Sequence, residues 1–153
     1  MLFFKKNGFT IIELMVVITI IAFLAMIAVP NMMHYVAKAK RTEAYAQLAS
    51  LALAQKAYFA EHGAYTTRIG TAQGLNWKCQ GSCNYSYGFA SGQEGVDYFI
   101  GKLKAPASAL AKAKIGPKDF VMLAAADIDG DGELDILSVD QDNVFTILSD
   151  DLA

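Results

Sequence analysis

The chain begins with one long apolar stretch that stands apart from everything after it. From Leu14 to Val29 the only polar side chain is Thr19. With residues 9–12 the stretch reaches about 20 residues, enough to cross a bilayer as a helix at roughly 1.5 Å per residue. One carboxylate, Glu13, lies within it. A charge in such a segment costs about 2.5–3.5 kcal/mol on insertion scales, so Glu13 indicates a function and a partner group.

Helix-forming sequence continues beyond Pro30, which ends the apolar stretch. Residues 31–61 are rich in Ala, Lys, Gln, Leu and Glu, which are strong helix formers. Their apolar positions recur at three- and four-residue steps and predict one buried face: Tyr45, Leu48, Ala49, Ala52, Tyr58 and Phe59. Gly63 is suited to a C-terminal cap. The pattern predicts one helix from Phe9 to Glu61 that is kinked at Pro30.

The remaining residues, 63–153, predict a small head of short strands. Glycines at 63, 70, 74 and 81 mark a loop. Alternating or continuous apolar runs of strand length predict strands at 84–89, 120–126, 134–139 and 144–148. The fold class is therefore α+β, with a long kinked N-terminal helix packed on an antiparallel sheet of three or four strands. Residues 107–114 predict a short helix, and residues 92–118 otherwise show no pattern.

We divide the chain into four regions. Residues 1–8 precede the apolar stretch, residues 9–30 form a transmembrane or assembly half of the helix, residues 31–62 form its head-packing half, and residues 63–153 form the head. A chain of 153 residues leaves room for one such head. Lys5 and Lys6 would hold the N-terminus in the cytoplasm, with the head on the other side of the membrane.

The charge balance argues against general nucleic-acid binding. The formal net charge is −2, and ten of the 15 carboxylates lie from Asp119 onward. Bulk positive charge, the usual electrostatic footprint of a nucleic-acid-binding protein, is absent from the composition. We therefore expect no nucleic acid as a default partner.

The junction before the apolar stretch carries a family resemblance. Gly8-Phe9-Thr10-Ile11-Ile12-Glu13-Leu14 resembles the class III signal of type IV prepilins and pseudopilins. The resemblance implies that a prepilin peptidase removes residues 1–8, that Phe9 becomes the N-methylated terminus, and that Glu13 directs assembly. Residues 39–44 and 54–59 resemble type IVa pilins of the deltaproteobacterial kind. The alternative interpretation is an ordinary signal anchor or an uncleaved secretory signal.

The family resemblance also implies a partner for Glu13. Its carboxylate would pair with the charged amine of Phe9 on a neighbouring subunit. Opposite charges attract strongly in a low-dielectric bundle, and either one left alone is penalised. Such a pair would set the register of assembly, and Pro30 would shape the same helix. The alternative is an unpaired carboxylate that stays neutral.

Two further motifs lie in the head. Cys79 and Cys83 are four residues apart in a predicted loop, where a short disulfide is geometrically possible and fits an oxidising compartment. Metal binding by these cysteines is less favoured, since there is no second pair and no nearby histidine. The acidic run resembles the start of an EF-hand calcium loop, with candidate ligands Asp127, Asp129, Asp131, Glu133 and Asp135. Its twelfth position is Ser138, so a plain acidic turn stays open as the alternative.

These features predict a structural subunit of a type IV pilus with roles in motility or adhesion. The expected partners are identical subunits in a helical filament, the prepilin peptidase, the assembly machinery and the inner membrane before assembly. The expected location is the inner membrane as a single-pass precursor, then the extracellular pilus. The alternatives are a type II secretion pseudopilin and a membrane-anchored calcium-binding module. No enzyme is expected, since no nucleophile has a base and the histidines are His34 and His62. Calcium is the one cofactor considered.

Overall fold

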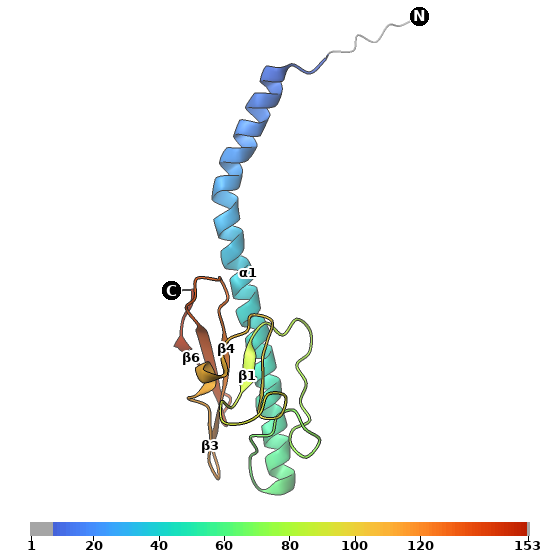
Figure 1. Ribbon diagram of the computed structural model, residues 1–153, viewed down its shortest axis with the longest axis vertical. Helices are drawn as coiled ribbons and strands as arrows, with labels where there is room; N and C mark the ends of the chain where they lie inside the picture. Colours follow the sequence, from blue (N-terminus) through green and yellow to red (C-terminus); the bar gives the residue numbers. More distant parts are fainter. Residues whose placement is uncertain (1–7, 153) are drawn as a thin grey trace, which may run out of the picture. The chain divides into compact units, whose positions relative to one another are not determined.

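The computed structural model describes residues 8–152, so the basic leader with Lys5 and Lys6 lies outside the described residues. Its longest element is helix α1, Ile11–His62, which continues through Pro30 (Figure 1). The single long helix predicted from the sequence is thereby confirmed. The chain divides into two units, the first ending at Tyr35 and the second beginning at Val36, and each is described by itself.

The first unit is helical from Ile11 onward and buries none of its side chains. All residues from 8 to 35 are exposed. Among the described residues, α1 is the one helix long and apolar enough to span a membrane, and its most apolar 18-residue window is 0% buried. The kink expected at Pro30 stays a prediction.

In the second unit, α1 presents one face to a core. The buried positions follow helical spacing because residues three, four and seven apart share a face, and they are Ala37, Ala44, Leu48, Leu51, Ala52 and Gln55. The predicted face was correct at Leu48 and Ala52 and wrong at Ala49, which is exposed.

The helix ends where its sequence predicts. Gly63 has φ +70°, and its N–H donates to the carbonyl of Phe59 at 2.8 Å. A residue in this left-handed conformation closes the last helical turn, and glycine adopts it without a Cβ clash.

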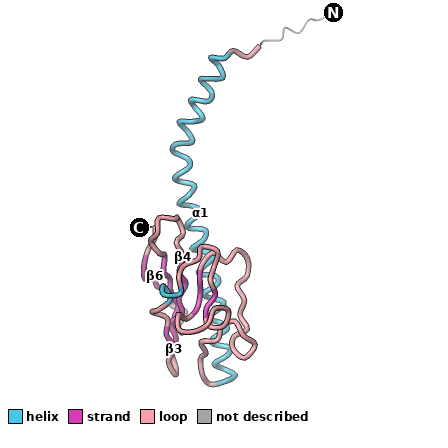
Figure 2. Tube along the Cα trace, in the orientation of Figure 1, coloured by secondary structure: helices cyan, strands magenta, loops and turns pink. Residues whose placement is uncertain are grey.

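The head is an antiparallel sheet of six strands. Five of them follow the order β2-β1-β4-β5-β6, and β3 pairs with β4 outside this order. Figure 2 draws the strands in magenta. The strands are β1 Ser86–Gly88, β2 Tyr98–Phe99, β3 Lys114–Ile115, β4 Phe120–Ala126, β5 Asp135–Asp140 and β6 Phe145–Ser149. Strand β4 is central. One of its edges pairs with β5 over its length, and the other pairs with β3 near Phe120 and with β1 near Ala124.

The antiparallel α+β fold is confirmed, with two corrections. The sheet has six strands rather than three or four, because β2 and β3 are two-residue strands within 92–118. Two residues are too few to show an alternating pattern. The helix predicted at 107–114 is a single 3₁₀ turn, Ala107–Leu110, and the chain then enters β3.

The core lies between α1 and the sheet. Its largest fully buried side chains include Tyr85, Tyr87, Phe89 and Phe120. Tyr65, from the loop after α1, stacks on Phe59 and meets Phe120 edge to face at 4.9 Å between ring centroids. Aromatic pairs of this kind add about 0.5–1.5 kcal/mol beyond area burial. The loop after α1 is thereby held against both layers.

Candidate functional site

The predicted processing junction is an open segment ahead of α1. Gly8 and Phe9 have no helical or strand assignment and both are exposed, Phe9 by 74%. A Cβ built on Gly8 would meet no heavy atom within 4 Å. The junction is therefore accessible to a protease and lies outside the helix.

Thr10 and Glu13 form a reciprocal cap at the start of α1. The Thr10 N–H donates to Glu13 Oε2 at 2.9 Å, and the Glu13 N–H donates to Thr10 Oγ1 at 3.3 Å. The Thr10 hydroxyl also donates to Glu13 Oε2 at 2.8 Å. This is a capping box, which satisfies two of the backbone N–H groups that a helix start leaves unpaired. Glu13 therefore has a second, structural role, and the Thr-x-x-Glu spacing at residues 10–13 was the sequence signal that could have revealed it.

Glu13 also lines a surface recess of the first unit. The recess has a volume of about 400 Å³, and apolar side chains form the rest of its wall: Phe9, Ile12, Val16 and Val17. Only Oε2 of the Glu13 carboxylate is engaged by Thr10. The other oxygen can accept a donor that enters this recess from outside the chain.

The predicted disulfide is confirmed. Cys79 and Cys83 are bonded, with their Cα atoms 6.0 Å apart. Cys83 is buried and adopts φ +52°, while Gly81 between the two cysteines has φ +85°. The Gln47 side chain on α1 donates to the Gln80 carbonyl at 2.6 Å, which ties this small ring to the helix.

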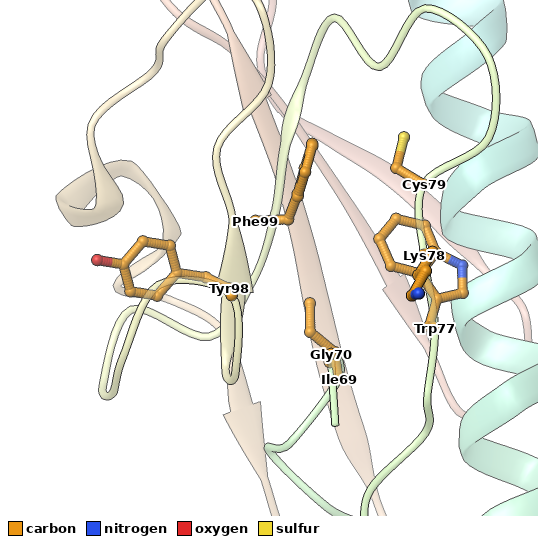
Figure 3. A pocket seen from close by; sticks show the side chains of 8 residues that line it. Ile69, Gly70, Trp77, Lys78, Cys79, Tyr98 and Phe99 are labelled. Atoms are coloured by element: carbon orange, nitrogen blue, oxygen red, sulfur yellow. The ribbon is translucent and has the colours of Figure 1, made fainter. Parts of the chain in front are cut away.

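A pocket of about 290 Å³ lies beside the disulfide. Figure 3 shows its wall formed by Phe99 of β2 and by Trp77 and Cys79 on the loop beside α1. The Trp77 indole N–H donates to the Ser50 hydroxyl at 2.8 Å. The eight residues lining the pocket include no carboxylate and no imidazole. The ionisable side chains on its wall are those of Lys78 and Tyr98.

The acidic loop between β4 and β5 folds around its own carboxylates. Asp127 accepts from the N–H groups of Gly130 and Gly132, at 2.7 and 3.2 Å. Asp129 and Asp131 each accept from the N–H two residues further on, at 3.1 and 2.8 Å. Both glycines have φ above +90°, a conformation that favours glycine. These bonds turn the loop so that its carboxylates face one another.

The predicted metal-ligand set is only partly brought together. Oxygens of Asp127, Asp129, Asp131 and Asp151 all lie within 4.8 Å of one another. The expectation was wrong in including Glu133 and Asp135, which are not in this cluster, and in missing Asp151. Full charges about 4 Å apart repel by about 1 kcal/mol even in water, so four carboxylates favour a bound cation or protonation.

Asp151 is the least exposed member of this cluster. Only 8% of the residue is accessible. Its Oδ2 accepts from the N–H of Ile128 at 2.8 Å, and its Oδ1 is buried without a hydrogen-bond partner among the described residues. Burial raises the pKa of Asp151, and the neighbouring charges of Asp129, Asp131 and Asp127 raise it further against the opposing Ile128 hydrogen bond.

Asp135 instead belongs to a buried network at the start of β5. It accepts from Arg41 of α1 in a two-bond fork and from the Tyr85 hydroxyl at 2.5 Å. Arg41 also binds Asp150. Burial by itself would lower the pKa of Arg41, but the bonds to Asp150 and Asp135 outweigh it and raise the pKa. Burial, and then the Asp135 carboxylate, raise the pKa of Tyr85. An Asp committed in this way is a structural anchor of the head.

Sequence reasoning missed Asp151 and the partners of Asp135. Asp151 lies 20 residues after Asp131, on the far side of two strands. For Asp135, the sequence offered one signal of a partner, which was Arg41. This is the last basic residue of the group that follows the apolar stretch, and in a helical projection it lies on the face toward the core.

Two families of known proteins match the chain in adjacent segments. Residues 3–29 match the prokaryotic N-terminal methylation motif. Residues 30–105 match the type IV minor pilin ComP, DNA uptake sequence receptor. The two matched segments together cover the N-terminal helix and the head as far as the loop after β2.

Individual relatives include both pilins and secretion proteins. The chain is 45% identical over 62 residues, 40% of its length, to the type IV major pilin protein PilA of Myxococcus xanthus (strain DK1622). It is 39% identical over 72 residues, 47% of its length, to type II secretion system core protein G of Pectobacterium carotovorum subsp. carotovorum. It is 36% identical over 94 residues, 60% of its length, to fimbrial protein EcpC of Eikenella corrodens.

These matches cover part of each relative. The chain spans 28% of the Myxococcus pilin, 44% of the Pectobacterium protein and 60% of the Eikenella protein. The relatives are structural filament proteins rather than enzymes. The methylation motif, the exposed apolar helix and the antiparallel head occur here in one chain. The chain is a type IV pilin-like or pseudopilin-like protein that carries the N-terminal methylation motif.

Proposed function

We propose that this chain is the structural subunit of a type IV pilus. In this proposal a prepilin peptidase cuts between Gly8 and Phe9, Phe9 is N-methylated, and the subunit polymerises through its N-terminal helix. The observation that carries the proposal is the exposed apolar half of α1 directly behind this junction. Every large apolar side chain from Ile11 to Val36 is at least 43% exposed.

Such a surface needs a partner that the described chain does not supply. Apolar surface left in water costs about 25 cal/mol per Å², and α1 is apolar on all sides in this region. Lipid covers it in the precursor, and identical helices cover it in a filament. Assembly then needs no chemical step in the subunit, because the apolar helix leaves lipid and enters a bundle of identical helices, which is also apolar.

Glu13 supplies the register in this proposal. In lipid or in a bundle its charge is expensive unless it is paired. The Phe9 amine that processing would create on a neighbouring subunit is a cation that would pair with the Glu13 carboxylate. Thr10 supports this role, because its hydrogen bonds hold one oxygen of Glu13 and leave the other to accept from a neighbour.

The head is proposed to lie outside the cytoplasm. The Cys79–Cys83 disulfide supports this location, since disulfides form and persist in oxidising compartments. The precursor would therefore wait in the inner membrane, with its leader in the cytoplasm, before the assembly machinery adds it to a surface filament with motility or adhesion roles.

The test is intact mass spectrometry of protein sheared from the cell surface, with and without reductant. The expected mass is that of residues 9–153 plus one methyl group, rising by two hydrogens on reduction. A sheared species that retains residues 1–8 would overturn the processing step. If shearing releases no such protein while the trimmed form remains in the inner membrane, the result supports a pseudopilin or a minor subunit instead.

The alternative is a pseudopilin of type II secretion, favoured by the similarity to core protein G. Both functions use the same helix and the same processing, so they differ in whether the assembled subunits form a surface filament or serve secretion. Deleting the gene separates them. Loss of surface filaments with normal secretion supports the pilin, whereas a secretion defect in cells that never had filaments of this protein supports the pseudopilin.

A further inference from the structure

Four carboxylates from two distant parts of the sequence meet at one end of the sheet. Asp127, Asp129 and Asp131 come from the loop between β4 and β5, and Asp151 follows β6. The loop holds its three carboxylates inward through hydrogen bonds to its own N–H groups. The C-terminal segment brings the fourth.

Asp151 is what distinguishes this cluster from a solvated acidic turn. The residue is more than nine-tenths buried, and its Oδ1 has no hydrogen-bond partner in residues 8–152. The N–H of Ile128 engages the other oxygen at 2.8 Å and sets the orientation of the carboxylate. A buried charged oxygen with no donor is strongly penalised, so a cation bound beside Asp151 would stabilise its charged form.

The described side chains do not supply that group. Both ion pairs within residues 8–152 are made by Arg41, which binds Asp135 and Asp150. Lys40 is nearby in sequence, and its ammonium donates to the Ile128 carbonyl at 2.6 Å rather than to a carboxylate of the cluster. The cluster therefore gathers four acidic groups with no ion pair of its own.

The spacing of the oxygens fits calcium. Two oxygens bound to one Ca²⁺ at about 2.4 Å can lie at most about 4.8 Å apart. The four oxygens of this cluster all lie within 4.8 Å of one another. Mg²⁺ binds at about 2.0–2.1 Å and retains several waters, so four protein carboxylates suit it less well.

We propose that Asp127, Asp129, Asp131 and Asp151 bind one calcium ion, with Asp151 closing the site from the C-terminal segment. The ligand set differs from the EF-hand pattern of the sequence, in which Glu133 and Asp135 would take part. This inference does not depend on whether the chain serves a pilus or a secretion system.

Calcium bound at this site would hold the C-terminal segment against the head. Asp150 binds Arg41 of α1, and the next residue, Asp151, binds the loop between β4 and β5. The two residues together attach this segment to both layers of the head. Without calcium, repulsion among the four carboxylates acts directly on Asp151 and loosens the end of the chain.

The test uses the full chain in detergent micelles, with calcium chloride titrated into metal-free protein by calorimetry. One calcium per chain is expected, with a dissociation constant of about 10⁻⁴–10⁻³ M, as in extracellular calcium modules. Thermal unfolding is then followed with EDTA, magnesium or calcium. At about ten times the dissociation constant, calcium is expected to raise Tm by about 5 °C, and magnesium by less.

Four variants test the ligand set. Asp151→Asn and Asp129→Asn remove a charge at nearly constant shape and are expected to weaken calcium binding at least tenfold or so. Glu133→Gln removes a predicted ligand that the structure leaves out, and Asp142→Asn removes an exposed acid in the turn between β5 and β6. Both are expected to bind calcium as the parent chain does.

Three results would overturn the proposal. These are an absence of calorimetric binding at millimolar calcium, unchanged binding by Asp151→Asn, and loss of binding by Glu133→Gln while Asp151→Asn retains it. Because binding is measured directly, a variant that is merely less stable is recognised by its lower Tm in EDTA. If Asp151→Asn does not fold, Asp129→Asn still tests the ligand set, since it also is expected to weaken calcium binding.

Discussion

Arg41 on helix α1 and Asp135 at the start of β5 form a two-bond ion pair, with Nε 3.0 Å from Oδ2 and Nη2 2.5 Å from Oδ1. The Asp135 side chain is 0% exposed and that of Arg41 is 14% exposed. Tyr85, the residue just before β1, donates to the same carboxylate. One buried acid at the start of β5 thus joins the helix to the segment that leads into β1.

We predict that Arg41→Ala lowers the free energy of unfolding by about 3–5 kcal/mol, because it leaves Asp135 buried without a counter-charge. The measurement is chemical denaturation of the full chain in detergent. Lys38→Ala is the matched control, since Lys38 is exposed on the same helix and surface changes usually stay within about 0.5 kcal/mol. Equal stability of the two variants would show that the ion pair contributes nothing.

Replacement by phenylalanine is expected to affect stability differently at Tyr87 and at Tyr85. The Tyr87 hydroxyl is buried and has no hydrogen-bond partner among the described residues. Tyr87→Phe is therefore expected to leave stability unchanged or to raise it by about 1 kcal/mol. Tyr85→Phe removes a donor to the buried Asp135 and is expected to cost about 1.5–3 kcal/mol. Denaturation curves for the two variants settle the comparison, and a larger loss for Tyr87→Phe would contradict it.

Alkaline pH is expected to destabilise the head through these tyrosines. Burial, and then the charge of Glu43, raise the pKa of Tyr87 above its ordinary value. A phenol with a raised pKa in the folded state contributes stability that is complete below about pH 10, its ordinary pKa, and is lost as pH rises further. The denaturation midpoint is measured at several pH values below and above 10. It should fall as pH rises for the parent chain and fall less for Tyr87→Phe. Parallel curves would contradict this.

Glu13→Ala is expected to leave processing intact and to prevent efficient filament assembly, because the carboxylate proposed to pair with a neighbour is gone. Surface filaments are counted by electron microscopy, and the leader is followed by mass. Thr10→Ala is the control. It removes the hydroxyl half of the capping box, worth about 1 kcal/mol, but keeps the Glu13 carboxylate. Filaments in Thr10→Ala but not in Glu13→Ala would show that the carboxylate itself is needed, and normal filaments in Glu13→Ala would contradict the pairing.

Gly8→Val is expected to leave residues 1–8 attached. The exposed Gly8 has no heavy atom within 4 Å of a built Cβ, so the substitution disturbs no packing and acts only on recognition by the peptidase. Intact mass of the membrane-bound protein measures the outcome, with Asn7→Ala as the control that should still be trimmed. A trimmed Gly8→Val product would show that the cut lies elsewhere.

Much of the fold could be predicted because its signals are local. The single helix through Pro30, the Gly63 cap, strand β4 and the hairpin of β5 and β6 all follow from periodicity and turn residues within a few positions. In that hairpin, Asp140 accepts from the N–H groups of Asp142 and Val144 at 2.9 Å each, as an Asp at the start of a turn is suited to do. The disulfide was predictable for the same reason, since its cysteines are four residues apart.

The sequence by itself determined the apolar helix, the Gly8–Phe9 junction with Glu13 behind it, and the family. These depend on residues that are neighbours along the chain. Only the tertiary structure decided how the acidic residues divide. It brought Asp151 to Asp127, Asp129 and Asp131, and it committed Asp135 to Arg41 and Tyr85. The reason is that strands β5 and β6 return the end of the chain to the loop where β5 began, a contact that no local pattern encodes.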